Sequence, residues 1–364
     1  MPSRGIPLNT LKTIAEQFTS GKTISEVAEF GNGNINDTYI VTDTSHEKLV
    51  LQRINTHVFK QPQRIMQNMR AFTEHVHARV QKEKRTWQSP RVIPAQDGSD
   101  FYIDPAGNFW RAISFIQNSR SYDTITNLAH AREVGSALGT FQSLISDLPI
   151  QSLADTLEGF HITPLYLHYY DQMYTQHKRA QSPEVNHAIQ FIEDRRAFAF
   201  TLENAGLTQR PIHGDPKVNN VMVHNETGKA ISIVDLDTVK PGLVHYDIGD
   251  CIRSGSNPLG EDAENWEAVH YDPEIGSAIL EGYLAEAKTF LTAADYEHLY
   301  TSIRLLAFEL GLRFFSDYLA GDIYFKVKYP EHNLQRALVQ FQLTKSIEAH
   351  EAEIRNSIQK AINA

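Results

Sequence analysis

The sequence has only one cysteine, Cys251, among its 364 residues, and it has no long apolar run. A single cysteine excludes an internal disulfide framework and fits a reducing compartment. No apolar run is long enough to cross a bilayer, and the first residues lack the apolar core of a signal peptide. We therefore expect a cytoplasmic protein with no membrane partner.

Positive charge is also in short supply. The chain carries 34 Lys and Arg residues against 44 Asp and Glu residues, a formal net charge of -10. Proteins that bind nucleic acid usually present a basic face, so this balance argues against a nucleic-acid partner. No internal repeat or low-complexity tract is visible. The remaining composition, 41% hydrophobic and 21% charged, is typical of globular proteins, and the length suggests two or three domains.

The chemically informative side chains are concentrated just past the middle of the chain. The pattern there predicts a polar loop followed by a β-hairpin with strands at 221–223 and 231–234. Pairing these strands brings Asn220 beside Asp235. Because Asp215 lies five residues before Asn220, local geometry alone draws the three side chains together.

This set of side chains matches the needs of phosphoryl transfer. That chemistry uses an aspartate to orient a hydroxyl, and an Asn with a second aspartate to hold Mg²⁺ on ATP phosphates. The same order and spacing are found in the catalytic and metal loops of protein kinases. An ordinary hairpin with polar ends is the alternative. However, Asp235 follows an apolar strand, where an unpaired carboxylate is costly to bury and a divalent ion is the simplest counter-charge.

The central stretch resembles the aminoglycoside and choline phosphotransferase superfamily. Here His213, Gly214 and Asp215 stand in place of the His-Arg-Asp of protein kinases. The resemblance implies an α+β, two-lobed, protein-kinase-like fold that binds ATP and Mg²⁺. An N-terminal antiparallel-sheet lobe would span 1–116, and a larger, mainly helical lobe would span 117–364.

Nucleotide contacts are expected at two places. The resemblance implies that backbone groups near Phe115 and Gln117, in a hinge at about 115–119, meet the adenine edge; an edge strand entering a loop would look the same. Gly31 and Gly33 lie in a turn between two predicted strands. Such a turn is often only a hairpin, but upstream of a catalytic loop we interpret it as one that approaches the phosphates.

Some positions depart from the protein-kinase pattern or leave two interpretations open. Gln52, followed by Arg53, stands where protein kinases carry an ATP-binding lysine. Either of these residues substitutes, or phosphate charge is handled elsewhere. Period-two alternation would put Asp237 on the same strand face as Asp235. Asp237 is then either a second metal ligand or a structural residue. In the predicted loop at 245–250, the resemblance implies that Asp247 braces the catalytic loop.

Periodicity predicts the remaining elements. Helices are expected at 9–18, 61–80, 129–144, 165–177, 185–204, 293–319 and 334–361, and short strands at 48–54, 91–94, 100–104 and 109–116.

Three segments are similar to a narrower family, the N-acetylhexosamine 1-kinases. They are GNGNINDTYIVT, HGDPKVNNVMV with VDLDTVKPG, and GLRFFSDYLAGDIYFKVKYPEHN. The resemblance implies a sugar substrate, with Asp215 as the base that faces the anomeric hydroxyl. It further implies that Lys217, Arg313 and Tyr324 contact the sugar or the transferring phosphate.

The same resemblance extends to four further positions. Asn220 and Asp235 would hold Mg²⁺, and Asn34 and Asn36 would reach the acceptor, although one member of that family carries histidine at the position of Asn34. The residue pattern adds Asp317 as a substrate-binding candidate, because it lies four residues after Arg313 and shares its helical face; an ordinary surface ion pair has the same pattern.

Two other functions compete with this one. A kinase for an amino alcohol or aminoglycoside would want carboxylates and few basic residues near its acceptor, whereas Lys217 and Arg313 are basic. A catalytically inactive, kinase-like binding protein would lack at least one of Asp215, Asn220 and Asp235, and all three are present. We expect a monomer.

Overall fold

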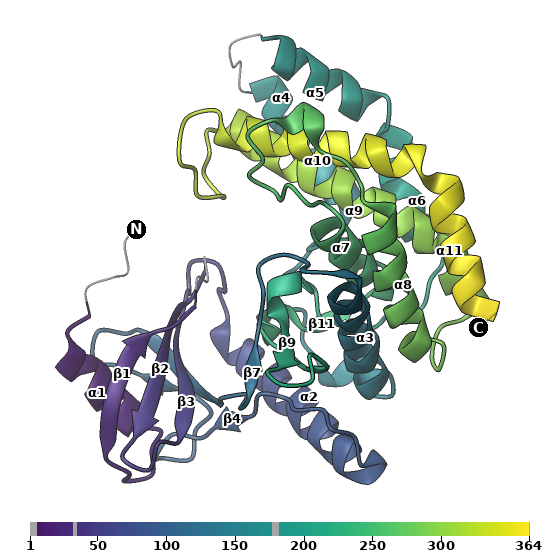
Figure 1. The fold of residues 1–364 in the computed structure, drawn as a ribbon. Coiled ribbons are helices and arrows are strands. Elements are labelled where there is room, and N and C mark those ends of the chain that lie inside the picture. The colour runs from purple at the N-terminus through teal and green to yellow at the C-terminus, as the bar shows by residue number, and fades with distance from the viewer. Residues whose placement is uncertain (1–5, 32–34, 177–181, 364) are drawn as a thin grey trace. The chain divides into compact units, whose positions relative to one another are not determined.

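The computed structural model describes residues 6–31, 35–176 and 182–363, so the predicted sites Gly33 and Asn34 lie outside it. The fold is α+β, with an N-terminal antiparallel sheet and a larger helical C-terminal portion (Figure 1). The chain divides into two compact units. The first unit comprises residues 1–119, 147–157 and 236–240, and the second unit comprises residues 120–146, 158–235 and 241–364. The division lies three residues after the predicted one, and two later segments join the first unit.

The first unit is built on an antiparallel sheet in the order β1-β2-β3-β6-β4, with β5 also paired to β6. Tyr39, Leu51 and Ala112 are opposite one another across three strands, and their buried face packs against Leu11 and Ile14 of the first helix. Side chains of the opposite parity therefore project from the other face. The elements are α1 (Leu8–Glu16), β1 (Ile24–Glu29), β2 (Asp37–Asp43), β3 (Lys48–Ile54), α2 (Pro62–Glu83), β4 (Val92–Ile93), β5 (Tyr102–Ile103) and β6 (Phe109–Ser114).

The second unit is mainly helical, and one of its hydrophobic clusters includes the stacked ring pair Phe191 and Phe341 together with Phe308 and Phe315. Its helices are α3 (Leu128–Ile145), α4 (Thr163–Gln176), α5 (Pro183–Glu193), α6 (Thr201–Asn204), α7 (Val244–Gly255), α8 (Pro273–Ala287), α9 (Ala293–Ala320), α10 (His332–Ala349) and α11 (Glu351–Asn363). Its hairpin strands are β9 (Val221–His224) and β10 (Ala230–Ile233), preceded by β8 (Arg210–Ile212). The two short strands β7 (Ser119–Arg120) and β11 (Lys240–Gly242) lie at boundaries between the units.

Local sequence signals explain where several helices begin and end. Thr292 and Asp295 form a reciprocal capping box at the start of α9, and Gly321 ends this helix in the left-handed conformation. Asp272 caps α8 by accepting two backbone N–H groups, and proline occupies the next position. Most of the predicted helices and all of the predicted strands are confirmed within a few residues.

Three predicted elements were wrong. The single helix predicted at 334–361 is two helices, which meet at His350, where the ring is hydrogen-bonded to the Ser346 carbonyl. The helix predicted at 185–204 stops after Glu193. The predicted loop at 245–250 lies inside α7. Within this helix a Cβ at Gly249 would lie 2.7 Å from the Ser302 carbonyl oxygen, so the glycine allows close helix packing.

Helices α3 and α8 approach so closely that their backbones touch. A Cβ at Gly135 would lie 1.9 Å from the Ile279 carbonyl oxygen, and a Cβ at Gly282 would lie 1.9 Å from that of Arg132. Backbone atoms cannot swing aside as a flexible side chain can. We therefore expect Gly282→Ala to lower the free energy of unfolding by about 3 kcal/mol, the upper end for overpacking. Urea titration measures this.

The control for this substitution is on the same helix. Ala285 is exposed on α8, so Ala285→Gly should cost only the difference in helix propensity, about 1 kcal/mol. A Gly282→Ala variant as stable as the wild type would show that the two helices separate readily.

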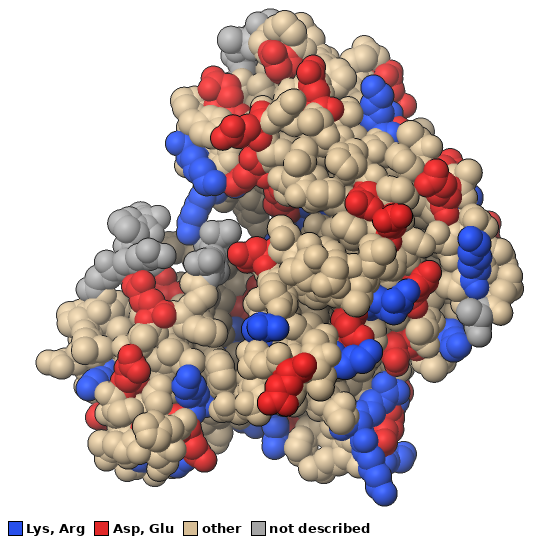
Figure 2. Space-filling view, in the orientation of Figure 1, with Lys and Arg blue, Asp and Glu red and all other residues tan. Residues whose placement is uncertain are grey.

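No helix in the described part of the chain combines the length and apolarity needed to cross a bilayer. On the face shown in Figure 2, basic and acidic side chains are intermingled among the residues drawn in colour, and neither sign dominates.

Candidate active site

The loop that follows β8 folds on itself before the hairpin begins. The backbone N–H of Lys217 donates to the Asp215 carbonyl at 2.9 Å, and the N–H of Asn220 donates to the Lys217 carbonyl at 2.9 Å. The Asn220 carbonyl in turn accepts from the N–H of Val234 at 2.8 Å, one residue before Asp235. Backbone hydrogen bonds therefore hold the end of the loop beside the end of the return strand.

The return strand ends in a sharp change of backbone direction. Asp235 has φ 62°, in the left-handed region that few non-glycine residues occupy. A 3-10 turn, Leu236–Thr238, follows it directly. The prediction that Asp237 continues the strand on the face of Asp235 was therefore wrong, because the strand stops at Ile233 and Asp237 belongs to the first unit.

Asn220 is oriented by the loop that precedes it. Its Nδ2 donates to the Asp215 carbonyl at 2.8 Å, and its Oδ1 makes no hydrogen bond with any described residue. An amide oxygen fixed in this way beside an aspartate suits Mg²⁺, which takes one or two protein oxygens and completes its shell with phosphates and water. Among the described residues, no group of three or more His, Cys, Asp or Glu side chains could hold a metal without such help.

The carboxylate of Asp215 is partly exposed and contacts a cation. Lys217 Nζ lies 2.9 Å from Oδ1 and 3.1 Å from Oδ2 of Asp215. The Asp215 carboxylate, together with Glu261 and Asp250, holds the pKa of the Lys217 ammonium above its usual range. Lys217 therefore keeps its charge beside the proposed base throughout the physiological pH range.

The two carboxylates beyond Lys217 are themselves compensated. Arg253 is almost completely buried, and it donates to Asp250 at 2.8 Å and to Glu261 at 2.7 Å. Burial would raise the pKa of Glu261, but the charges of Arg253 and Lys217 outweigh it and hold this pKa low. Both acids therefore stay ionised within a network of alternating charges.

Backbone groups of the predicted catalytic loop, residues 213–220, are held by side chains from elsewhere in the second unit. Asp247 accepts the N–H groups of His213 and Gly214, each at 2.8 Å, and also the Gln142 amide at 2.8 Å. Gln142 is held by the Tyr283 hydroxyl, again at 2.8 Å. The contact of Asp247 with this loop agrees with the bracing role that the resemblance implies.

His213 links the loop to the return strand. Its Nε2 donates to the Val234 carbonyl at 3.0 Å, and its Nδ1 accepts from the backbone N–H of Asp215 at 3.2 Å. Burial lowers the pKa of this imidazole, in keeping with a neutral ring that donates on one side and accepts on the other.

Arg313 lies among aromatic rings. Its guanidinium carbon is 5.2 Å from the ring centroid of Phe160, 5.0 Å from that of Tyr166 and 5.5 Å from that of Phe325. These are cation–π distances. Its N–H groups make no ion pair or hydrogen bond within the residues that the structure describes. Arg313 therefore retains hydrogen-bond donors in a half-buried apolar setting.

Asp317, one turn further along α9, shapes the loop that follows the helix. Its carboxylate accepts backbone N–H groups of Ile323, Tyr324 and Phe325 at 3.0, 2.8 and 2.9 Å, as well as the Asn333 amide at 2.9 Å. The Tyr324 side chain stays 64% exposed. Asp317 is thus occupied by the loop, and its contact with an acceptor stays a prediction.

In the first unit, the sheet face bearing Gln52 carries a buried cation that sequence reasoning missed. Arg111 donates to Gln52 Oε1 through Nε and Nη2 at 2.9 and 2.7 Å, and its Nη1 pairs with Asp237 Oδ1 at 2.5 Å. The other oxygen of Asp237 accepts from Asn36 at 2.6 Å. These contacts give Asp237 a structural ion pair. The only signal in the sequence was one arginine inside an apolar strand.

The remaining predicted nucleotide contacts are spread over the first unit. Arg53 pairs with Asp37 and, by strand alternation, points to the face opposite Gln52. Phe115 packs edge-on against Phe30, with ring centroids 6.0 Å apart. Gly31 has φ 75°, which a side chain would strain, and Gln117 is exposed.

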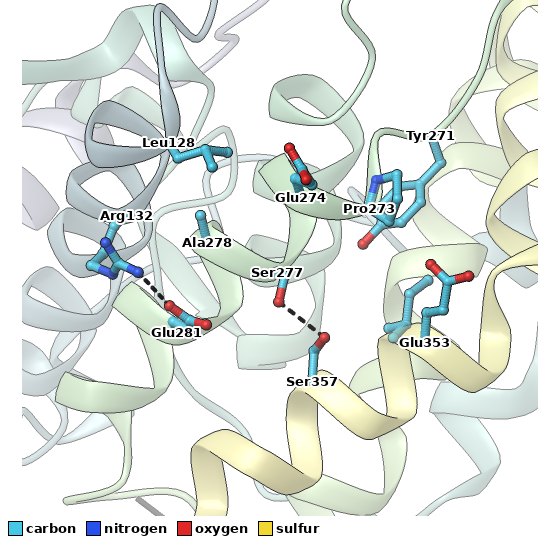
Figure 3. A pocket seen from close by; sticks show the side chains of 11 residues that line it. Leu128, Arg132, Tyr271, Pro273, Glu274, Ser277, Ala278, Glu281, Glu353 and Ser357 are labelled. Atoms are coloured by element: carbon cyan, nitrogen blue, oxygen red, sulfur yellow. Dashed lines mark hydrogen bonds and ion pairs between the residues drawn. The ribbon is translucent and has the colours of Figure 1, made fainter.

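One pocket in the second unit lies outside this set of residues. It has a volume of about 390 Å³ and is lined from α3, α8 and α11 (Figure 3). Arg132 pairs with Glu281 across it, and Ser277 bonds Ser357. None of the predicted site residues lines it, so we do not place the active site there.

Solved structures of several phosphotransferases are similar to the chain over nearly its whole length, and three of them illustrate this likeness. An aminoglycoside phosphotransferase from Alicyclobacillus acidocaldarius has 13% identity and a TM-score of 0.60, covering 99% of this chain and 98% of that one. Amicoumacin kinase hAmiN, in complex with AMP-PNP, Ca²⁺ and Ami, has 15% identity and a TM-score of 0.61, covering 95% and 94%. Choline kinase from Cryptosporidium parvum has 13% identity and a TM-score of 0.59, covering 97% and 98%.

At these identities the likeness concerns the fold, and it confirms the predicted protein-kinase-like class. The likeness in sequence is more direct. The sequence model of the phosphotransferase enzyme family matches residues 26–288, which is more than half of the chain. This range includes the whole of the predicted catalytic loop and the hairpin. The chain belongs to the phosphotransferase enzyme family.

Proposed function

We propose that this protein transfers the terminal phosphoryl group of ATP to the anomeric hydroxyl of an N-acetylhexosamine, giving the sugar 1-phosphate and ADP. The family membership supports the reaction class. One observation carries the choice of acceptor: Arg313 keeps unpaired donors among three aromatic rings. A planar cation that can donate to hydroxyl and carbonyl oxygens, beside rings that can cover C–H faces, suits a neutral sugar.

In this proposal Asp215 accepts the proton of the attacking hydroxyl and orients it for in-line displacement. Lys217 stays charged near the transferring group. Asn220 and Asp235 would hold Mg²⁺, which when bound would offset negative charge on the phosphoryl oxygens. Arg313 and Tyr324 contact the sugar.

The nucleotide would contact the first unit. We propose contacts at Gly31, Gln52, Phe115 and Gln117. Gln52 is favoured over Arg53, because Arg53 projects from the opposite sheet face and already pairs with an aspartate. The contact with Gln52 would be made on the sheet face that also carries the Arg111–Asp237 pair.

A cationic acceptor, as in choline or aminoglycoside kinases, is the second candidate. The carboxylates around Lys217 are all engaged: Asp250 and Glu261 by Arg253, and Asp215 by Lys217. An amine would therefore meet the charge of Arg313, while these three carboxylates already pair with cations of the protein. This arrangement favours a neutral acceptor.

The test is ATP turnover with Mg²⁺ across N-acetylglucosamine, N-acetylgalactosamine, glucose, galactose, choline and kanamycin, with phosphorus NMR of any product. An anomeric phosphate on the N-acetylhexosamines is expected. Turnover with choline or kanamycin alone would overturn the acceptor and keep the reaction class. Binding of ATP without turnover of any acceptor would favour an inactive, kinase-like protein.

Replacing the arginine tests the acceptor site directly. Arg313→Met keeps much of the packing but removes charged hydrogen bonds worth about 1.5–3 kcal/mol. We expect KM for the sugar to rise about 10- to 100-fold, following that energy, with KM for ATP unchanged. Arg304→Met, which removes an arginine stacked on Phe198 earlier in α9, is the matched control and should leave both KM values unchanged. An unchanged sugar KM in Arg313→Met would place the acceptor elsewhere.

A further inference from the structure

His161 lies just before α4 and is only 3% exposed, with a backbone φ of 64°. The left-handed conformation is unfavourable for a non-glycine residue and persists where its surroundings fix it. Both ring nitrogens face oxygen atoms at short range. Nδ1 is 2.8 Å from Glu309 Oε1, and Nε2 is 2.8 Å from the Gly214 carbonyl oxygen.

The partners of this ring define its protons. A carbonyl oxygen only accepts, so Nε2 must carry a hydrogen. Nδ1 faces a carboxylate whose other oxygen accepts from the Thr163 hydroxyl at 2.7 Å. Burial alone would lower the pKa of His161, but the charge of Glu309 outweighs it and raises this pKa above the ordinary value. Ring and carboxylate therefore form a buried imidazolium–carboxylate pair with every polar atom satisfied.

We infer that His161 and Glu309 are positioning residues that fix the peptide unit directly before the base. Asp247 holds the N–H of Gly214, and His161 holds its carbonyl, so the backbone entering Asp215 is held on both sides. Neither His161 nor Glu309 is placed in contact with the reactants. The role of Asp215 in this inference rests on the proposed function.

The pair also connects two parts of the candidate site. Glu309 lies on α9 one turn before Arg313, the residue proposed to recognise the acceptor. A continuous series of contacts therefore runs from α9 through Glu309 and His161 to the catalytic loop. A shift of α9 would therefore move Glu309 and His161, and with them the backbone directly before Asp215.

The kinetic test uses His161→Phe, which keeps a ring to stack on Tyr246, now 5.5 Å away, and removes both donors. We expect kcat to fall about 100-fold, the effect of a displacement of about 1 Å in a catalytic group. KM for ATP and for the acceptor should change by less than about threefold, since binding groups are untouched. A wild-type kcat in His161→Phe would overturn the inference.

Two further variants separate positioning from stability. Thr163→Val removes a buried hydrogen bond to the same carboxylate without touching the loop, so it should lower stability but keep kcat. If Glu309 acts through His161, adding Glu309→Gln to His161→Phe should lower kcat no further. Strictly additive losses, or an equal loss of kcat in Thr163→Val, would indicate a general structural role.

Two further measurements keep the inference testable if His161→Phe does not fold or if the acceptor is wrong. If His161→Phe does not fold, His161→Leu replaces it, because its smaller side chain donates to neither partner; a kcat about 100-fold below wild type supports the inference, and a wild-type kcat contradicts it. Nitrogen NMR of His161 at pH 7 in the unmodified protein should show two protonated ring nitrogens. A single protonated nitrogen would overturn the ion pair, whether or not the panel identifies an acceptor.

Discussion

Asp215→Asn is expected to lower kcat about 10³- to 10⁴-fold, at the upper end of what a general base contributes. Asparagine has the same shape, but it cannot take up a proton and no longer offers a charge to Lys217, now 2.9 Å away. ATP affinity, measured by calorimetry, should stay within about threefold of wild type, because the proposed nucleotide contacts are unchanged. Turnover of the acceptor identified by the panel measures kcat.

Asp194→Asn, an equal change at an exposed position that ends α5, provides the control and should have wild-type kinetics. If Asp215→Asn kept a tenth of the wild-type kcat, the base would have to be another group. A large loss of ATP affinity in Asp215→Asn would instead indicate that the carboxylate mainly supports nucleotide or metal binding.

Asp247→Ala should have the largest effect on stability. It leaves the buried N–H groups of His213 and Gly214 and the Gln142 amide without their acceptor. Each unsatisfied group costs about 1–3 kcal/mol, so for three groups we expect a loss of at least about 3 kcal/mol in the free energy of unfolding. Urea titration measures the loss, and kcat should fall with it because the catalytic loop is released.

Asp247→Asn separates the charge from the hydrogen bonds. One oxygen of the amide can still accept, so the expected loss is about half as large, on the order of 2 kcal/mol. Equal losses in the two variants would mean that the carboxylate charge, rather than the number of acceptors, stabilises the loop.

The part of the site that could be predicted is the part that is local in sequence. Asp215, Asn220 and Asp235 lie within one loop and hairpin, and the turn between the strands fixes which residues meet. Strand β3 and the strands before it were also predictable, because their signal lies within a few consecutive residues. Alternation of buried and exposed residues was sufficient for these elements.

The parts that escaped prediction are held by contacts between distant residues. His161 is 148 residues from Glu309 and 53 from Gly214. No spacing rule links such positions, and His161 stands in an unremarkable turn before a helix. Arg111 was readable as a lone charge in an apolar strand, but its partner Asp237 was assigned to the wrong element. The segment 245–250 was predicted as a loop, whereas it lies in a helix whose Gly249 contacts α9, which is a tertiary feature.

The close contact of α3 and α8 has a consequence for how the protein opens. Gln142 on α3 joins the Tyr283 hydroxyl on α8 to Asp247, and through it to the backbone of the catalytic loop. Because the backbones of α3 and α8 touch at Gly135 and Gly282, we expect the two helices to unfold together and not one at a time. The amide hydrogens of His213 and Gly214 should therefore exchange with solvent deuterium as slowly as those of the core helices, although loops usually exchange quickly. The segment proposed to carry the chemistry belongs to the last region to unfold.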